Sequence, residues 1–291
     1  MKKQISKIEP AASFAGAKFH PALVQIAGIL GEALLPLMPR RARAIAEEGF
    51  TLVNGRRRNI IDAVIRAGMA HRALRGGSPD LLAAYHRRFW TGESAREYHE
   101  RRRAEFVPEF SEILENLNRL LLMHDEFKTL CEIGTGSGQM LEYLAGRLTT
   151  VERFIGIDLN PDTIEDNRKR YADAGLEFIA ADGEEWIRAH GRSNWVFFSH
   201  RGVFEYFPQK KLENMLAFIA REIKPVIFVA IEPVGIDHDL VKEQESVVYG
   251  REFSFSHNYP YLFRKAGFEV KHSECKPGPD YRLCVLMAAA F

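Results

Sequence analysis

The stretch EIGTGSG, residues 132–138, decides how the rest of this chain is interpreted. It lies between an apolar run at 128–133, which is typical of a buried strand, and a helical pattern at 139–148. Glycines at a strand-to-helix turn let backbone amides approach a nucleotide-like ligand closely. Alone the loop is a weak signal, because three alternating glycines can also form a tight turn and nothing more.

Strand-like and helical patterns alternate from this loop toward the C-terminus. Strand-like runs occupy 154–157, 176–180, 195–199 and 226–231, and helical patterns occupy 160–171 and 212–223. Such alternation predicts an α/β fold with a mainly parallel, doubly wound sheet. The ending differs, because a helix at 259–266 precedes two strands, 268–272 and one that starts at Tyr281. Strands joined by so short a turn must be antiparallel, since a parallel crossover needs about a dozen residues.

Acidic residues follow the second and third strands of this pattern. Asp158 comes twenty residues after Gly138, where its carboxylate can accept hydrogen bonds from both hydroxyls of a ribose. Asp182 stands in Ala181-Asp182-Gly183 after the third strand, where an acid can hold the amino group of adenine. The carboxyl ends of parallel strands meet at one edge of the sheet. The glycine loop and the two acids therefore predict one ligand site at that edge.

Together these motifs resemble those of the class I S-adenosylmethionine-dependent methyltransferases. The family's acid-x-Gly-x-Gly-x-Gly motif is matched at 132–138, its second acid in GIDLN at 156–160, and its third motif at 181–182. The resemblance covers 127–291 and implies a seven-stranded, mostly parallel Rossmann-like sheet with an antiparallel last strand. It implies S-adenosyl-L-methionine as cofactor, with Gly134 and Gly136 at the methionine portion, Asp158 at the ribose and Asp182 at the adenine. The other residues expected at this site are Glu132, Thr135, Gly138, Leu159, Gly183 and Ser199.

A nicotinamide-binding Rossmann domain is the main competing interpretation. Its fingerprint is Gly-x-Gly-x-x-Gly/Ala. Counted from Gly134 the sixth residue is Gln139, and counted from Gly136 it is Leu141, so neither register fits. That fold also predicts neither Glu132 nor an antiparallel hairpin at the end of the chain.

The loop after the fourth strand, 199–207, should face the transferred methyl group in a methyltransferase fold. If the acceptor is a hydroxyl or a protonated amine, a base should remove its proton, and His200 is the best-placed base. A histidine that only bonds the loop backbone explains His200 equally well. Tyr206 is a weaker catalytic candidate because it abuts a helix, and His257 lies in an insert, 235–258, where family members often place substrate-gripping elements.

The acceptor class is narrowed by two motifs that are missing. Loop 199–207 lacks the Asn/Asp-Pro-Pro-aromatic signature of enzymes that methylate adenine or protein glutamine, which argues against a nucleic-acid base. The adjacent Asp-Asn metal ligands of catechol-type enzymes are also missing, and Asp237, His238 and Asp239 are expected to form a polar turn, with no metal. We therefore expect methyl transfer by in-line displacement to an oxygen or nitrogen of a small-molecule metabolite. The alternatives are aminocarboxypropyl transfer from the same cofactor, as in nicotianamine synthase-like enzymes, and a non-catalytic scaffold.

Residues 1–125 form a predicted helical region in front of the methyltransferase domain at 126–291. Helical patterns occupy 20–34, 58–74, 78–90 and 108–123, without convincing strands. An added helical layer can cover an open cleft, so this region is expected to be a lid, a homodimerisation surface, or both. Trp90, Tyr98 and His99 precede the last of these helices, where related enzymes place a helix over the cofactor. Packing against the sheet explains them equally well.

Composition sets the remaining expectations. The 291 residues are 46% hydrophobic and 27% charged, which is ordinary for a globular protein in water. The net charge of +1 gives no reason to expect nucleic acid as a partner. Arginine clusters at 40–43, 56–58 and 101–103 are expected to be solvated, with RNA binding as the alternative. Three cysteines without metal or redox spacing favour the cytoplasm, and Gln25, Glu32 and Pro36 interrupt the one stretch, 21–39, that approaches a membrane span.

Overall fold

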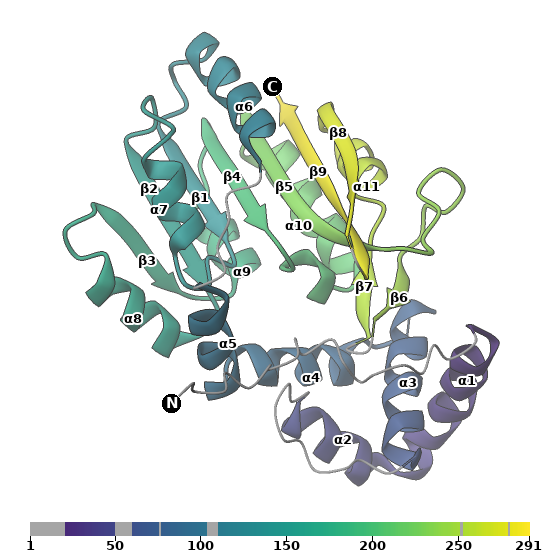
Figure 1. Ribbon diagram of the computed structural model, residues 1–291. Helices are drawn as coiled ribbons and strands as arrows, with labels where there is room; N and C mark the ends of the chain where they lie inside the picture. Colours follow the sequence, from purple (N-terminus) through teal and green to yellow (C-terminus); the bar gives the residue numbers. More distant parts are fainter. Residues whose placement is uncertain (1–20, 50–59, 76, 104–109, 251–252, 279) are drawn as a thin grey trace, which may run out of the picture. The chain divides into compact units, whose positions relative to one another are not determined.

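The computed structural model describes residues 21–49, 60–75, 77–103, 110–250, 253–278 and 280–291 (Figure 1). The arginine cluster at 56–58 and the predicted helix starts at 20, 58 and 108 lie outside these ranges. The chain divides into two compact units, Met1–Phe89 and Trp90–Phe291. The second unit begins well before residue 126, because it includes the helix predicted at 108–123 and a further helix, at 93–103, that the sequence did not reveal. Within the described ranges, no helix combines the length and apolar character needed to cross a membrane.

The first unit consists of helices. They are α1 (Pro21–Leu37), α2 (Pro39–Glu48), α3 (Ile60–Leu74) and α4 (Asp80–Trp90), whose last residue belongs to the second unit. The sequence predicted α1, α3 and α4. It did not reveal α2, because this arginine-rich helix buries only Ala42, Ile45 and Ala46.

Helices α1 and α3 cross at two glycines. A Cβ at position 31 would lie 1.9 Å from the carbonyl oxygen of Val64, and one at position 68 would lie 2.1 Å from the carbonyl carbon of Gly31. The apolar spacing at 20–34 is typical of a helix that faces a core, yet Leu23, Ile26 and Leu30 are 55%, 52% and 56% exposed. The glycine face of α1, which permits backbone-to-backbone approach, makes the contact with α3 instead.

Replacing Gly31 by alanine is expected to destabilise the first unit by about 1–3 kcal/mol or more, because the new methyl group would meet backbone that cannot move aside. Thermal unfolding followed by circular dichroism measures the loss. Gly146→Ala is the matched control, since its Cβ would meet nothing nearer than 3.7 Å. The control should leave stability unchanged or slightly higher. Identical unfolding curves for Gly31→Ala and the unmodified chain would contradict the close crossing.

The second unit is built on a seven-stranded sheet with the order β3-β2-β1-β4-β5-β9-β8. Its strands are β1 (Thr129–Ile133), β2 (Arg153–Asp158), β3 (Leu176–Ala180), β4 (Trp195–His200), β5 (Val226–Gly235), β8 (Glu269–Pro277) and β9 (Tyr281–Ala290). Strands β1 to β5 pair in parallel, whereas β9 runs antiparallel to both β5 and β8. The predicted fold class, with its seven strands and antiparallel last strand, is confirmed.

Helices cover both faces of this sheet (Figure 1). On one face, α6 (Ser111–Met123), α7 (Gln139–Ala145) and α8 (Pro161–Arg170) contribute to one apolar cluster. On the other, α9 (Gly183–His190), α10 (Gln209–Glu222) and α11 (Tyr259–Ala266) contribute to a second. Strand β5 is buried along its whole length between the two clusters. The remaining elements are α5 (Glu93–Arg103), the short 3-10 helix η1 (Phe204–Tyr206) and a hairpin of β6 (Val247–Tyr249) and β7 (Ser254–Ser256).

The C-terminal hairpin brings two cysteines together. Cys275 on β8 stands directly opposite Cys284 on β9, and both are free thiols. A side-chain hydrogen bond to Cys284 lowers the pKa of Cys275 to about 7. Spacing along the sequence could not show this pair, because strand register and not separation in the chain places the two side chains.

Candidate active site

The loop between β1 and α7 is shaped by three glycines in the left-handed backbone region. Gly134, Gly136 and Gly138 have φ angles of 72°, 49° and 75°, which glycine adopts without strain. The amides of Gly134 and Thr135 donate hydrogen bonds to the carbonyl of Ile157 at 2.8 and 2.9 Å. These bonds tie the glycine loop to the end of β2, the strand that carries the second predicted acid.

Side chains pack closely on this glycine loop. A Cβ at position 134 would lie 2.4 Å from Val203 Cγ2, and one at position 136 would lie 2.8 Å from the ring of His99. At position 138 a Cβ would lie 2.8 Å from the ring of Tyr171. The loop therefore has room for backbone only, which is the arrangement that lets amides face a nucleotide-like ligand.

Glu132 stabilises the loop from within the protein. Its side chain is buried, accepts a hydrogen bond from Thr135 Oγ1 at 2.6 Å and accepts another from the backbone of Leu141. Burial raises the pKa of Glu132 to about 8. The structure thus gives the two predicted cofactor residues Glu132 and Thr135 a positioning task, in which they hold the glycine loop against the first turn of α7.

Asp158 lies beside the glycine loop at the end of β2. Its Oδ2 accepts a hydrogen bond from the amide of Gly136 at 3.0 Å, and its Oδ1 accepts one from the amide of Asn160 at 2.9 Å. Each half-buried carboxylate oxygen is thus held by one amide, and each can accept a further bond. Half-buried Leu159 follows it. The predicted pairing of the loop with this acid is therefore present in the fold.

Asp182 begins α9 and links it to α10. Its Oδ1 accepts hydrogen bonds from the amides of Glu184 and Glu185, and its Oδ2 lies 3.3 Å from Lys211 Nζ. The next residue, Gly183, is packed so that a Cβ there would lie 2.8 Å from Ile133. Lys211 is a charged neighbour of the site that the sequence did not single out, because it lies on a later helix.

Helix α5 packs over the glycine loop through aromatic side chains. The ring of Trp90, just before α5, lies 5.7 Å from that of His99 and 5.1 Å from that of Tyr206 (ring centroids), and Tyr98 is a further neighbour at 5.7 Å. Burial lowers the pKa of His99, an effect that nearby Asp158 partly opposes. A continuous set of rings thus connects the glycine loop, at Gly136, with the loop after β4. A lid in the N-terminal region stays a prediction, and α5 is the helix of that region that packs on the glycine loop.

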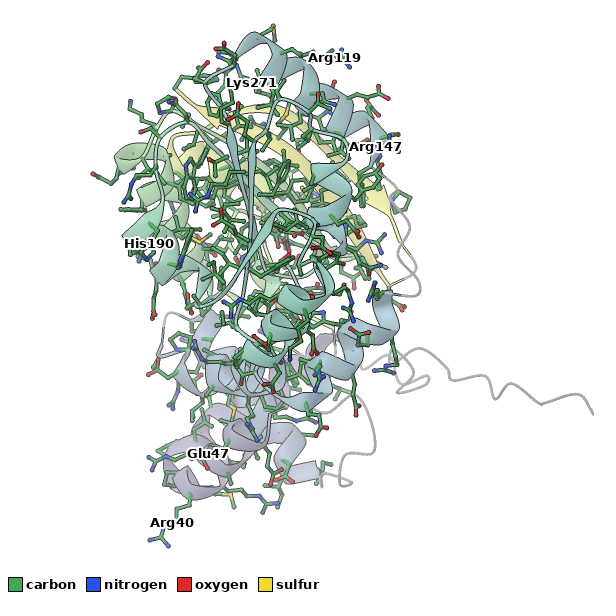
Figure 2. All side chains as sticks on the ribbon, turned by 90° about the vertical axis from the view of Figure 1, so that its left-hand side faces the viewer. Arg40, Glu47, Arg119, Arg147, His190 and Lys271 are labelled. Atoms are coloured by element: carbon green, nitrogen blue, oxygen red, sulfur yellow. The ribbon has the colours of Figure 1, made fainter. Side chains whose placement is uncertain are left out.

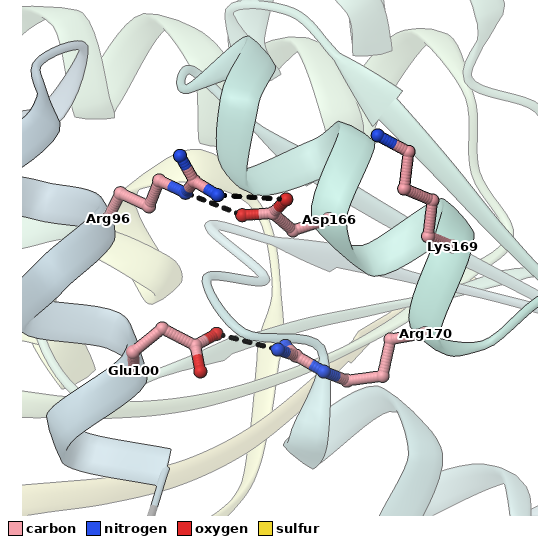
Figure 3. A pocket seen from close by; sticks show the side chains of 5 residues that line it. All are labelled: Arg96, Glu100, Asp166, Lys169 and Arg170. Atoms are coloured by element: carbon pink, nitrogen blue, oxygen red, sulfur yellow. Dashed lines mark hydrogen bonds and ion pairs between the residues drawn. The ribbon is translucent and has the colours of Figure 1, made fainter.

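Charged and polar contacts fix α5 to α8. Arg96 forms two hydrogen bonds with Asp166, at 2.6 and 3.2 Å, and Arg170 bonds Glu100 at 2.8 Å (Figure 3). Asn160, which begins α8, donates from its side-chain nitrogen to the carbonyls of Trp90 and Gly92 at 3.2 and 3.1 Å. Asn160 therefore joins the start of α5 to the strand end that carries Asp158.

The predicted catalytic residues have different environments. His200 ends β4 with its ring edge-on to Phe110, and its Nε2 finds no hydrogen-bond partner among the residues the structure describes. Burial lowers the pKa of His200 to about 3. Tyr206 belongs to the set of rings around Trp90. His257 is fully buried, with Nε2 donating to the Phe204 carbonyl at 3.0 Å and Nδ1 accepting from Ser246 Oγ at 2.6 Å. Both nitrogens of His257 are thus used to hold the loop, which suits the role of a structural histidine.

Ser199 lies in β4 opposite Ile133, the last residue of β1. It is fully buried and donates a hydrogen bond to Glu232 Oε1 at 2.7 Å. The place of Ser199 at the cofactor stays a prediction, and its hydrogen bond draws attention to Glu232, a residue that the sequence did not single out as a site residue. Ser199 and Glu232 are 33 positions apart, so no short sequence pattern could predict that they are in contact.

Charged side chains are exposed on the surfaces of both units. Arg40 and Glu47 on the first unit, and Arg119, Arg147, His190 and Lys271 on the second, are exposed (Figure 2). In the described ranges no group of three or more His, Cys, Asp and Glu side chains could hold a metal ion.

Comparisons with known proteins agree with this geometry. Residues 130–226 match the family model described as a methyltransferase domain, whereas no curated protein matches the sequence. Magnesium protoporphyrin IX methyltransferase from Synechocystis PCC 6803, solved with S-adenosylmethionine, is 12% identical over 70% of this chain and 95% of that one, with a TM-score of 0.47. Geranyl diphosphate methyltransferase is 11% identical over 60% of this chain and 85% of that one, with a TM-score of 0.43. TrmK from M. capricolum is 13% identical over 63% of this chain and 70% of that one, with a TM-score of 0.40. No TM-score among these reaches 0.5, so they say nothing about what this chain acts on.

The residues at the carboxyl edge suit S-adenosylmethionine. Asp158 offers carboxylate oxygens for ribose hydroxyls, and the glycine loop beside it has no space for side chains where a ligand must approach the backbone. The family match spans β1 to the start of β5, the segment that contains both the loop and the acid. The chain carries a class I S-adenosylmethionine-dependent methyltransferase domain, and S-adenosylmethionine is its cofactor.

Proposed function

We propose that this enzyme transfers the methyl group to an oxygen or nitrogen atom of a small-molecule acceptor. The observation that supports this best is the set of rings of Trp90, His99 and Tyr206, which leads from Gly136 to the loop after β4. An acceptor that reaches the cofactor there meets aromatic faces and a histidine under helix α5. Aromatic rings packed beneath a helix suit a small molecule better than a nucleic-acid duplex.

When bound, S-adenosylmethionine supplies a methyl group on a positively charged sulfur. Asp158 is proposed to bind the ribose, Asp182 the adenine, and the amides at Gly134 and Gly136 the methionine portion. The chain's own task is to align the acceptor and to exclude water, which α5 performs by lying on the glycine loop.

Two histidines are candidates for removing the acceptor's proton. Burial lowers the pKa of both His99 and His200, so each ring is available in its unprotonated form but is a weaker base than a free imidazole. The Nε2 of His200 is buried and has no hydrogen-bond partner within the part of the chain that the structure describes, so an acceptor that reached it would supply one. We propose His200 as the base and His99 as a residue that positions the acceptor against the glycine loop.

Alanine at position 200 is expected to reduce turnover by about 10²–10⁴-fold and to leave affinity for S-adenosylhomocysteine unchanged. His99→Ala should lower both turnover and affinity for S-adenosylhomocysteine, because His99 packs on Gly136. His190→Ala, at an exposed position of α9, is the matched control. The assay follows label from methyl-labelled S-adenosylmethionine into a fractionated metabolite extract. Unchanged turnover in His200→Ala removes its role as base, and transfer of label to added RNA or DNA in place of metabolites refutes the proposed acceptor class.

A further inference from the structure

The carboxylate of Glu232 is surrounded by hydrogen-bond donors. Glu232 is fully buried near the carboxyl end of β5. Its Oε1 accepts from Ser199 Oγ at 2.7 Å, and its Oε2 accepts from the amides of Gly202, Val203 and Phe204 at 3.2, 3.0 and 3.2 Å. Three successive amides of one loop thus converge on a single oxygen atom that comes from a neighbouring strand.

The backbone of this loop, 201–204, is bent so that the three amides point inward. Arg201 and Gly202 have φ angles of 58° and 98°, both in the left-handed region. The amide of Arg201 also donates to the carbonyl of Ile231 at 2.7 Å, and the carbonyl of Phe204 accepts from His257 Nε2. Glu232 is therefore the central contact of a loop that is held at both ends.

The loop fixed in this way packs on the glycine loop. Val203, whose amide is bonded to Glu232, is the side chain that a Cβ at Gly134 would meet at 2.4 Å. A displacement of Val203 would remove the contact that confines Gly134. The link from Glu232 to the glycine loop thus runs through Val203 and needs no contact between Glu232 and the glycines themselves.

Loss of the Glu232 oxygen would leave three amides without their acceptor in a buried place. Each unsatisfied buried group costs about 1–3 kcal/mol, so the loop would adopt another conformation in preference to keeping this one. Burial raises the pKa of Glu232 to about 7, against the lowering effect of its donors. Among the described residues, the hydrogen bonds to Glu232 Oε2 come from the three loop amides. These bonds are what the buried carboxyl contributes to the fold in return for the energetic cost of its burial.

We infer that Glu232 is a positioning residue for the cofactor, which it serves by fixing loop 201–204 so that Val203 confines the glycine loop. This role rests on the cofactor site and not on the identity of the acceptor. It is therefore tested by binding of S-adenosylhomocysteine, which needs no acceptor and remains measurable if the proposed acceptor class is wrong.

Four variants separate this role from a general effect on stability. Glu232→Ala should weaken binding of S-adenosylhomocysteine roughly tenfold or more, because the loop amides lose their acceptor. Glu232→Gln should bind within about threefold of the unmodified chain, since its carbonyl oxygen can accept the three amides and its nitrogen can donate to Ser199. Glu232→Asp keeps the charge but has a side chain shorter by one methylene group, so its oxygens should not reach the loop amides. It should therefore bind S-adenosylhomocysteine as weakly as Glu232→Ala. Glu222→Ala, at an exposed position of α10, should change nothing.

Calorimetry gives the affinities, and amide hydrogen exchange at residues 202–204 reports the loop directly. Slow exchange is expected for the unmodified chain and for Glu232→Gln, and fast exchange for Glu232→Ala. A folded Glu232→Ala variant with unchanged affinity would overturn the inference, as would a glutamine variant as weak as alanine. If Glu232→Ala fails to fold, Val203→Ala decides instead, because it leaves the Glu232 bonds intact. It should weaken binding while the amides stay protected, and unchanged binding would overturn the inference.

Discussion

Replacing Asp158 by alanine is expected to weaken binding of S-adenosylhomocysteine by about a hundredfold or more. Asp158 is the acid at the end of β2 that accepts the amide of Gly136 at 3.0 Å, so it serves the glycine loop and the proposed ribose site together. Hydrogen bonds to a charged group are worth about 1.5–3 kcal/mol each, and the loss of two reaches that hundredfold change. Calorimetric titration of the folded variant measures it.

The matched control for this variant is Asp173→Ala. Asp173 is an exposed acid between α8 and β3, in the same unit but away from the glycine loop, and its removal gives an equal change of charge. It should bind S-adenosylhomocysteine as the unmodified chain does. Equal affinities of Asp158→Ala and Asp173→Ala would refute the ribose site at Asp158.

Alanine at Gly134 is expected to cost about 2–4 kcal/mol, as lower stability, weaker cofactor binding, or both. Gly134 has a φ angle of 72°, which costs any other residue about 1–2 kcal/mol, and its Cβ would meet Val203 Cγ2 at 2.4 Å. Valine is stiff about χ1 and is held through its amide by Glu232, so it cannot turn aside easily. Thermal unfolding and calorimetry with S-adenosylhomocysteine measure the two effects.

Two further variants separate backbone strain from the steric clash. Gly175 has a φ angle of 68° but nothing within 4 Å of its added Cβ, so Gly175→Ala should show only the strain, about 1–2 kcal/mol. Val203→Ala in the Gly134→Ala background should restore part of the lost binding, because it removes the atoms that clash. A Gly134→Ala variant no weaker than Gly175→Ala would contradict the close packing of the two loops.

The sequence predicted the sheet well because local patterns specify it. Apolar runs alternating with amphipathic stretches located β1 to β5, and the short turn before Tyr281 required an antiparallel end. Asp158 was predictable for the same reason, because it follows its strand directly and lies at the edge where parallel strands end.

Helix α5 and the small hairpin of β6 and β7 could not be predicted in this way. The sequence of α5, ESAREYHERRR, has no apolar stripe, and its position depends on ion pairs with α8 and on the fit of His99 against Gly136. Glu232 likewise looks like any acid at a strand end until the fold brings the loop amides around it. Contacts between distant segments decide these roles, and they leave no periodic signal in the sequence.

The most direct test of the central claim is calorimetric titration of the unmodified chain with S-adenosylhomocysteine. The glycine loop, Asp158 and the family match at 130–226 predict saturable binding at one site per chain. A folded protein that shows no saturable binding would contradict the assignment of the cofactor and, with it, the function derived from it.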